Sequence, residues 1–306
     1  MALRVREITL ADASAERNRT PLQLFMRRFL RNRLAVLGVV LVLFMVAVAL
    51  FARQLAPMNP HISFPDGTTA QGLPLPPTWN WHHFFLGTDS SGRDEMSQLL
   101  YGTQVSMEVG FMATLITLVI GVFIGMISGF LGGFWDNVLM RFTDIVLAFP
   151  QLLFIILLRS VIPNPTVATV YIVIGVLGWA GVARIARGQT LAARKMEYVD
   201  AARSLGSRNL RIVFMHIFPN IMSPVIVYAT LLVANNIIFE SALSFLGIGV
   251  PDPTVSWGKM INLGLSWYQT DPWLIVWPGV AIAIATLGFN LLGDGLNDAF
   301  NPRAGE

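Results

Sequence analysis

The chain has no cysteine and few charged residues. Without cysteine there is no disulfide, and neither a thiolate nucleophile nor a thiolate metal ligand is available. Charged residues make up 13% of the 306 residues, hydrophobic residues make up 54%, and the mean hydropathy is +0.61. Soluble globular domains carry about 25% charged residues. The composition therefore indicates an integral membrane protein.

Two further absences bear on function. The sequence has no GxxxxGK[ST] phosphate loop, so any ATP chemistry is expected on another chain. Its 4 histidines do not have the spacing of a metal site or of an acid–base cluster. We therefore expect no metal site, no catalytic residue and no enzymatic activity. No internal repeat is evident, which favours a single membrane domain.

Long apolar runs predict the fold class. A run of about 18 or more apolar residues can cross a hydrocarbon core about 30 Å thick as a helix. The sequence predicts six such helices, and therefore an all-α integral membrane fold. They cover Leu34–Phe51, Val109–Phe130, Asn137–Leu158, Val167–Arg187, Pro224–Ile248 and Trp273–Leu296.

Positive charge is distributed unevenly between the loops. Lys and Arg gather before Leu34 and again between Arg184 and Arg211, whereas the alternate loops hold few. Because cytoplasmic loops carry the excess of Lys and Arg, we expect both termini inside (N-in, C-in) in a multi-pass protein of the cytoplasmic (inner) membrane. An interfacial aromatic belt is expected on the outer side. Its members are Trp79, Trp81, Trp257, Trp267, Trp273 and Trp277.

The chain divides into an anchor region and a membrane core. Residues 1–33 are expected to form a polar tail and an amphipathic elbow helix on the inner leaflet. Membrane anchoring explains the apolar stripe of this helix better than docking to a partner does. Residues 34–51 follow as an uncleaved transmembrane anchor rather than a signal peptide, and residues 52–108 as an extracytoplasmic loop. The core takes residues 109–306, with a cytoplasmic segment at 188–222.

Two helix starts are marked by capping residues. Thr20 precedes Pro21 and is expected to cap the elbow helix. In the outer loop, Ser91 or Asp89 is expected to cap a short helix that runs towards Tyr101.

The second predicted span carries glycine at every fourth residue. Such a face lets another helix approach closely. Packing within the bundle is favoured over a subunit interface, since helices in lipid need small-residue faces to associate. The residues are Gly121, Gly125, Gly129 and Gly133.

A polar, basic segment separates the fourth and fifth predicted spans. A helix is expected to continue from the fourth span through Ala202, and Gly206 supplies the left-handed residue that ends it. Ser207 is expected to cap a second short helix. Pro219 and Pro224 then redirect the chain into the membrane.

This segment has a small apolar face that suits a protein partner. Ala201, Ala202 and Leu205 are expected to share that face, beside Asp200 and Arg203. Small side chains permit close approach, so the face fits a groove on another protein. An ordinary surface loop is the plain alternative. A nucleic-acid-binding helix-turn-helix is disfavoured because both ends continue into membrane spans.

Ionisable side chains within the spans are candidate functional residues. Asp144 is expected to pair with Arg141, near the inner end of the third span. Glu240 lies deeper, with Asn235 and Asn236 about a turn earlier. These three residues are candidates for the substrate path, where Glu240 would contact a peptide ammonium. The alternative reading of Glu240, an interhelical hydrogen bond, is favoured.

The polar segment resembles the "EAA loop" of type I ABC importer permeases, through Asp200-Ala201-Ala202, Gly206 and Pro219. The likeness extends over nearly the whole chain and points to the dipeptide/oligopeptide/nickel branch. Further matching segments are LGTDSSGRDEMSQLLYGTQVSMEVG (Leu86–Gly110), RFTDIVLAFP (Arg141–Pro150), ESALSFLGIGVPDPTVSWG (Glu240–Gly258) and GFNLLGDGLNDAFNPR (Gly288–Arg303). The elbow helix followed by one extra span resembles the C-type subunit.

The resemblance implies a heteromeric importer. Its partners would be a B-type permease, two cytoplasmic ABC ATPases that bind ATP and Mg, an extracytoplasmic solute-binding protein and a peptide substrate. No cofactor would bind this chain. The segment at 188–222 would be the coupling loop that receives an ATPase. The residues implied in coupling are Asp200, Ala201, Ala202, Arg203, Leu205, Gly206 and Pro219.

Two residues depart from the family pattern. Asp200 stands where the motif usually has Glu, which shortens the side chain and keeps its charge. Glu108 stands where a neutral residue is expected, and no role is assigned to it. The cargo is left open among dipeptides, oligopeptides, nickel chelates and some sugars.

A proton-coupled secondary transporter of small solutes is the alternative function. In that reading Glu240 would carry the proton, and uptake would respond to an uncoupler and not to ATP. The family resemblance favours the ATP-driven importer.

Overall fold

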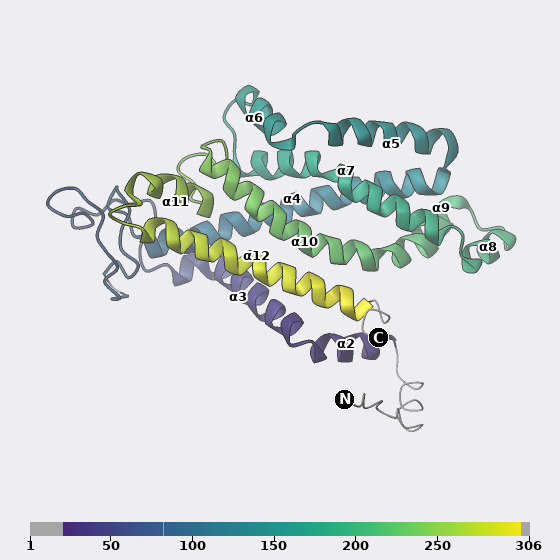
Figure 1. Cartoon of the computed structure of the whole chain (residues 1–306), viewed down its shortest axis with the longest axis horizontal. Coiled ribbons are helices and arrows are strands. Elements are labelled where there is room, and N and C mark those ends of the chain that lie inside the picture. The colour runs from purple at the N-terminus through teal and green to yellow at the C-terminus, as the bar shows by residue number, and fades with distance from the viewer. Residues whose placement is uncertain (1–20, 82, 301–306) are drawn as a thin grey trace, which may run out of the picture.

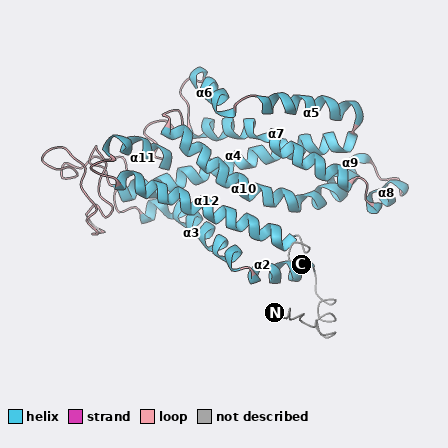
Figure 2. Cartoon of the chain, in the orientation of Figure 1, coloured by secondary structure: helices cyan, strands magenta, loops and turns pink. Residues whose placement is uncertain are grey.

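The computed structural model describes residues 21–81 and 83–300, and within them the secondary structure is helical (Figures 1 and 2). Only isolated β-bridges occur in this part of the chain. The helices are α2 (Pro21–Arg31), α3 (Arg33–Leu55), α4 (Glu95–Leu131), α5 (Gly133–Ala148), α6 (Gln151–Val161), α7 (Val167–Ala193), α8 (Glu197–Ser204), α9 (Asn209–Arg211), the π-helix η1 (Ile212–Ile217), α10 (Phe218–Phe245), α11 (Trp257–Gly264), the 3-10 helix η2 (Leu265–Trp267) and α12 (Trp273–Phe300).

Five helices are long and apolar enough to cross a membrane, or six if one bent pair counts as a span. The five lie in α3, α4, α7, the continuous stretch Asn209–Phe245 and α12. The prediction of a continuous third span over Asn137–Leu158 is wrong. That run is the bent pair α5 and α6, which meet at 81°.

Pro150 explains the bend between α5 and α6. Proline lacks an N–H and disfavours helical backbone in the residue before it. Phe149 accordingly adopts an extended conformation, with φ −82° and ψ 132°. The apolar run is therefore longer than the single straight helix that its sequence can form.

Helix α4 begins earlier than the hydropathy predicts. The expected short helix and second span are one helix that starts at Glu95, so the residues before Val109 are partly helical rather than loop. Its N-cap is Asp94, whose carboxylate accepts a hydrogen bond from the Ser97 N–H at 2.7 Å. The predicted caps Ser91 and Asp89 are wrong: Asp89 instead closes the preceding turn. Burial raises the pKa of Asp94, and the hydrogen bonds from Ser97 oppose this.

The glycines of α4 lie against α7. A Cβ on Gly121 would come within 2.5 Å of the Val182 Cβ, and one on Gly129 within 2.8 Å of the Thr190 Cβ. A Cβ on Gly125 would overlap the Ala183 carbonyl. This face therefore packs inside the bundle. The fourth residue of the predicted set, Gly133, lies beyond the end of α4 and packs on nothing within 4 Å of its Cβ position.

The elbow helix α2 packs on the bundle. Asn32 ends α2 and caps α3, where its side chain accepts from the Leu34 and Ala35 N–H groups. The rings of Phe25 and Phe300 contact each other at 4.7 Å between centroids, tilted by 39°, which joins α2 to the end of α12. The predicted cap Thr20 lies outside the described residues.

The bundle has two ends, which different elements occupy (Figure 1). We call the end with α2, α8 and the close of α12 the α8 end, and the opposite end, with α11 and residues 56–94, the α11 end. Trp257 of α11 is fully buried and packs with Met107 and Ile237. The prediction that Trp257 belongs to an interfacial belt is therefore wrong, because its ring lies in the protein core.

Candidate functional site: the α8 segment

Helix α8 is separated from α7 by a turn at residues 194–196, so the predicted continuous helix through Ala202 is wrong. Neither glycine nor proline marks the turn. It directs α8 so that Val199 and Ala202 pack with Ile212 and Ile217 in one buried cluster. A straight extension of α7 would carry these side chains away from the bundle. Tertiary packing, rather than a local sequence signal, therefore determines the turn between α7 and α8.

The two faces of α8 carry different residues. Val199 and Ala202 are buried against the bundle, whereas Ala201 and Leu205 are exposed. The predicted shared apolar face of Ala201, Ala202 and Leu205 is therefore wrong for Ala202. A helix rotates by 100° per residue, so adjacent alanines point in different directions.

Asp200 and Arg203 flank the exposed face. Their charged groups lie 3.5 Å apart, and both side chains are largely exposed. Such surface pairs contribute about 0 to 1 kcal/mol. Both charges thus remain accessible to a partner.

Gly206 ends α8 as predicted, with φ +76°. The Ser207 N–H donates to the Ala202 carbonyl at 3.1 Å, and the Gly206 N–H donates to the Arg203 carbonyl at 2.9 Å. These two bonds form the Schellman motif, which satisfies the last carbonyls of a helix. No atom lies within 4 Å of a Cβ position on Gly206, so the positive φ rather than crowding selects glycine.

The chain then enters the membrane as one continuous helical stretch. Arg208, not the predicted Ser207, precedes α9, and it makes no side-chain capping bond. The expected redirection at Pro219 and Pro224 is also wrong. Pro219 lies in the first turn of α10, where an N–H is not required, and Pro224 lies inside the helix. The π-helix η1 widens the turn immediately before these prolines.

Large apolar side chains are exposed around α8. Leu205 is 86% exposed, Leu210 74% and Met215 67%. Beside them, α4 and the 209–214 stretch line an apolar hollow of about 260 Å³. Leu210 and Met215 lie within the candidate span Asn209–Phe245, where lipid can cover them, whereas Leu205 lies before that span in the polar, basic segment. Exposed apolar side chains of this kind mark sites of protein or membrane interaction, and the polar surroundings of Leu205 favour a protein.

Glu240 is buried at the contact between α10 and α4. Its carboxylate accepts hydrogen bonds from Ser106 at 3.0 Å and from Ser244 at 2.6 Å. Asn236 is also buried and donates to the Thr114 hydroxyl at 2.9 Å. Both side chains thus join α10 to α4. Asn235 points elsewhere and is exposed.

The ion pairs differ from the predicted ones. Asp144 pairs with Arg184 of α7 at 2.6 Å, not with Arg141. Asp136, which the sequence reading missed, pairs with Arg187 through two hydrogen bonds of 2.5 and 2.6 Å. The pairs join α5 to α7 across a large separation in sequence, which local spacing does not reveal.

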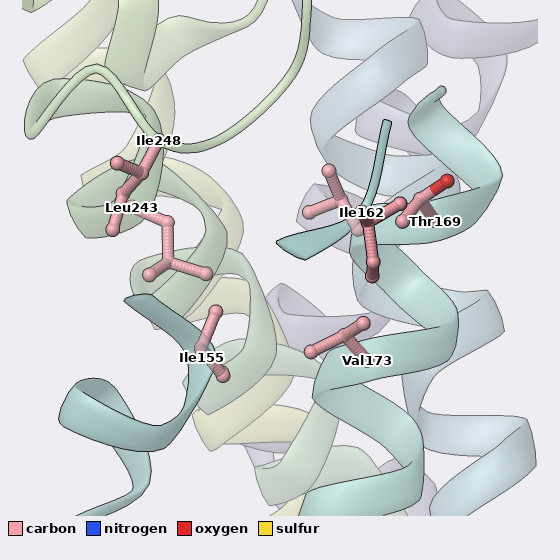
Figure 3. A pocket seen from close by; sticks show the side chains of 7 residues that line it. Ile155, Ile162, Thr169, Val173, Leu243 and Ile248 are labelled. Atoms are coloured by element: carbon pink, nitrogen blue, oxygen red, sulfur yellow. The ribbon is translucent and has the colours of Figure 1, made fainter. Parts of the chain in front are cut away.

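A small apolar gap lies between α6, α7 and α10 (Figure 3). Ile155, Val173 and Leu243 point into it, and Thr169 contributes the polar group among its lining residues. Its free volume of about 10 Å³ is at the limit for one water molecule. We therefore regard it as a packing seam.

Comparison with known proteins agrees with these features. Residues 121–306 match the family described as the binding-protein-dependent transport system inner membrane component. Residues 20–77 match the N-terminal TM domain of oligopeptide transport permease C.

Individual relatives cover most of the chain. It is 40% identical to the oligopeptide transport system permease protein OppC of Bacillus subtilis, over 91% of this chain and 88% of that protein. It is 39% identical to OppC of Escherichia coli K12, over 90% and 89% respectively. It is 37% identical to the glutathione transport system permease protein GsiD of Escherichia coli O6:K15:H31, over 93% and 91%. The chain therefore belongs to the multi-pass inner-membrane permeases of binding-protein-dependent ABC importers, as an OppC-like C-type subunit.

Proposed function

We propose that this chain is the C-type permease of a heteromeric importer that carries peptides into the cell. It pairs with a B-type permease, receives peptide from an extracytoplasmic solute-binding protein, and is driven by two cytoplasmic ATPases that bind ATP and Mg. The relatives are named for oligopeptide and glutathione transport, which supports peptides over nickel chelates or sugars as cargo.

The proposed topology places the α8 end in the cytoplasm. The α5–α6 pair then counts as the third of six spans, with both termini inside. The arrangement of the helices supports this: α2, α8 and the close of α12 lie at one end of the bundle (Figure 1). Lys and Arg of α2 and of the 194–211 stretch also gather there, in agreement with the positive-inside rule.

The exposed apolar face of α8 carries the proposal. Leu205 and Ala201 project from a helix that is held to the bundle by Val199 and Ala202. A rigid base with an exposed apolar tip suits insertion into a groove of an ATPase. Asp200 and Arg203 add charges beside the tip, and Gly206 and Pro219 shape the segment around it.

Affinity purification of the tagged chain in mild detergent, followed by mass spectrometry, tests the assembly. We expect a second permease and P-loop ATPases in near-stoichiometric amounts. Recovery of this chain alone, or of a homo-oligomer only, would contradict the proposal.

Two adjacent substitutions test the docking face. Ala201→Glu places a charge on the exposed face, so the chain should accumulate normally and lose its ATPases. Ala202→Glu buries a charge against the bundle, so the chain itself should lose stability. Ala201→Ser serves as the control of similar size. Normal ATPase recovery with Ala201→Glu would rule out docking through this face.

The proton-coupled alternative is tested in the same membranes. Glu240→Gln removes the ionisable group and retains hydrogen-bonding capacity. We expect trialanine uptake by this variant to remain dependent on ATP and to resist an uncoupler. Uptake that persists without ATP and is lost in Glu240→Gln would favour the secondary transporter.

A further inference from the structure

We propose that Asn235, Asn290 and Asp294 form a polar strip that lines a water-filled path for peptide backbones. The inference rests on the proposed importer function and refines it. The sequence predicted that Asn235, Asn236 and Glu240 line the substrate path. The inference keeps Asn235 and assigns residues of α12 to the path in place of Asn236 and Glu240.

The three residues lie on the exposed sides of two neighbouring helices, α10 and α12. These helices run side by side (Figure 1). They touch where a Cβ on Gly293 would come within 2.5 Å of the Thr230 hydroxyl oxygen. Asn290 and Asp294 are one turn apart on the exposed side of α12. Asn235 is on the exposed side of α10, away from the side by which α10 contacts α4.

The strip has no partners of its own. Asn235, Asn290 and Asp294 are exposed, and within residues 21–81 and 83–300 their side chains take part in no hydrogen bond or ion pair. The neighbouring polar side chains differ. Asn236 bonds to Thr114, and Asp298 accepts from Asn32 at 3.1 Å.

The depth of these side chains disfavours contact with lipid. At 1.5 Å per residue, Asn235 and Asn290 each lie about 15 Å from the end of their helix. Each helix has 28 residues and is about 42 Å long, so both side chains lie about 5 Å from its middle and well inside a 30 Å hydrocarbon core. Polar and charged side chains at such depth face a bundle interior or a water-filled cavity. This face of α10 and α12 is therefore assigned to the path.

The opposite face of the bundle provides the contrast. The exposed side chains of α4 include Leu115 and Val119, as expected next to lipid. Glu108 is exposed on the same helix, but it lies about 35 Å from the inner end at Leu131. It therefore reaches the outer boundary of the hydrocarbon core.

The chemistry of the strip fits a peptide main chain. An asparagine amide offers both donors and an acceptor, which match the N–H and C=O groups that every peptide presents. Recognition of this kind does not depend on the side chains of the cargo. Asp294, closer to the α8 end, supplies a carboxylate for a peptide's terminal ammonium.

The absence of cysteine allows a direct test in native membranes, because each introduced cysteine is the only thiol of the chain. We would prepare Asn235→Cys and Asn290→Cys, with Asn236→Cys as a buried control and Val119→Cys as a lipid-facing control. Each is treated with a charged, membrane-impermeant methanethiosulfonate, without nucleotide and with ATP plus vanadate. We expect at least tenfold faster modification at residues 235 and 290 than at the controls, and slower modification when trialanine is added.

Two results would overturn the inference. One is no modification at 235 and 290 in either condition, or equal modification at Val119→Cys. The other is modification that trialanine does not slow. Because labelling is read on this chain alone, recovery of the ATPases in the purification is a separate result that tests the importer itself. Asn235→Leu and Asn290→Leu should also accumulate normally and lower trialanine uptake about tenfold.

Discussion

Two pairs of large apolar side chains, at opposite ends of the bundle, differ sharply in burial. At the α11 end, Trp257 and Phe84 are 0% and 1% exposed. At the α8 end, Leu205 and Leu210 are 86% and 74% exposed. Trp257 and Phe84 are covered by their own chain, although Trp79 and Trp81 at the same end are 63% and 42% exposed. Leu205, by contrast, is left uncovered by residues 21–81 and 83–300. The difference indicates that Trp257 and Phe84 belong to an internal core of this chain, whereas Leu205 offers apolar surface to a partner.

Two polar contacts at the opposite ends also differ in burial. At the α11 end the Thr88 hydroxyl accepts from the Leu75 N–H at 2.7 Å and donates to the Gly67 carbonyl at 2.6 Å. At the α8 end the pair of Asp200 and Arg203 is exposed, with the groups 3.5 Å apart. Substitutions of these buried residues at the α11 end should therefore act on folding, and substitutions on the exposed face of α8 should act on association.

The largest effect is expected for Trp257→Ala. Removing a fully buried tryptophan costs about 3–5 kcal/mol through lost contacts and a cavity. The thermal unfolding of the purified chain should shift strongly to lower temperature. Trp79→Ala is the control, because that ring is 63% exposed, and it should change unfolding little. Equal shifts in unfolding temperature for both variants would contradict the claim that burial of Trp257 stabilises the fold.

Leu205→Ala should weaken association and leave folding unchanged. Burying a leucine at an interface is worth about 1.5–3 kcal/mol, so ATPase binding should fall about tenfold or more. Titration of the purified ATPase onto the stripped permease pair in nanodiscs measures this affinity. An unchanged affinity, or a lowered unfolding temperature, would contradict the assignment of Leu205 to the partner surface.

Gly206→Ala tests the geometry of the segment rather than its surface. A β-carbon at φ +76° costs about 1–2 kcal/mol, and no neighbour is crowded. We expect faster hydrogen exchange in α8 and a moderate loss of ATPase binding. Gly188→Ala, in the helical conformation of α7 and also uncrowded, is the control. If Gly188→Ala changed hydrogen exchange and ATPase binding as much as Gly206→Ala, the positive φ of Gly206 would not be the cause of the effect.

Asp200→Asn should have the smallest effect on folding. The ion pair with Arg203 is exposed and contributes at most about 1 kcal/mol. We expect an unfolding temperature within error of the wild type. A clear destabilisation would show that the α8 end, like the α11 end, is completed by its own contacts.

The sequence predicted what depends on local chemistry. The left-handed residue at Gly206, the elbow helix and most of the spans follow from backbone preferences and hydropathy. The glycines of α4 were correctly expected on one face through Gly129, but Gly133 lies past the helix end.

The errors occurred where tertiary contacts override local signals. The turn before α8 has no glycine or proline and exists because Val199 and Ala202 pack on the bundle. Asp144 and Arg184 come from different helices, so helical spacing suggested the wrong partner. Hydropathy missed the first turns of α4, which are polar and buried by α11 and the outer segment rather than by lipid.

The most direct test of the central claim is the accessibility of a thiol at residue 205. In Leu205→Cys, the only cysteine of the chain would lie on the exposed face of α8. The rate at which this thiol reacts with a water-soluble maleimide is measured in two preparations. One is intact membranes whose cytoplasmic side is open to the reagent, and the other is the same membranes after urea has stripped the peripheral subunits. The account predicts protection in the intact complex and rapid reaction after stripping. Equally rapid reaction in both would contradict an ATPase on this surface.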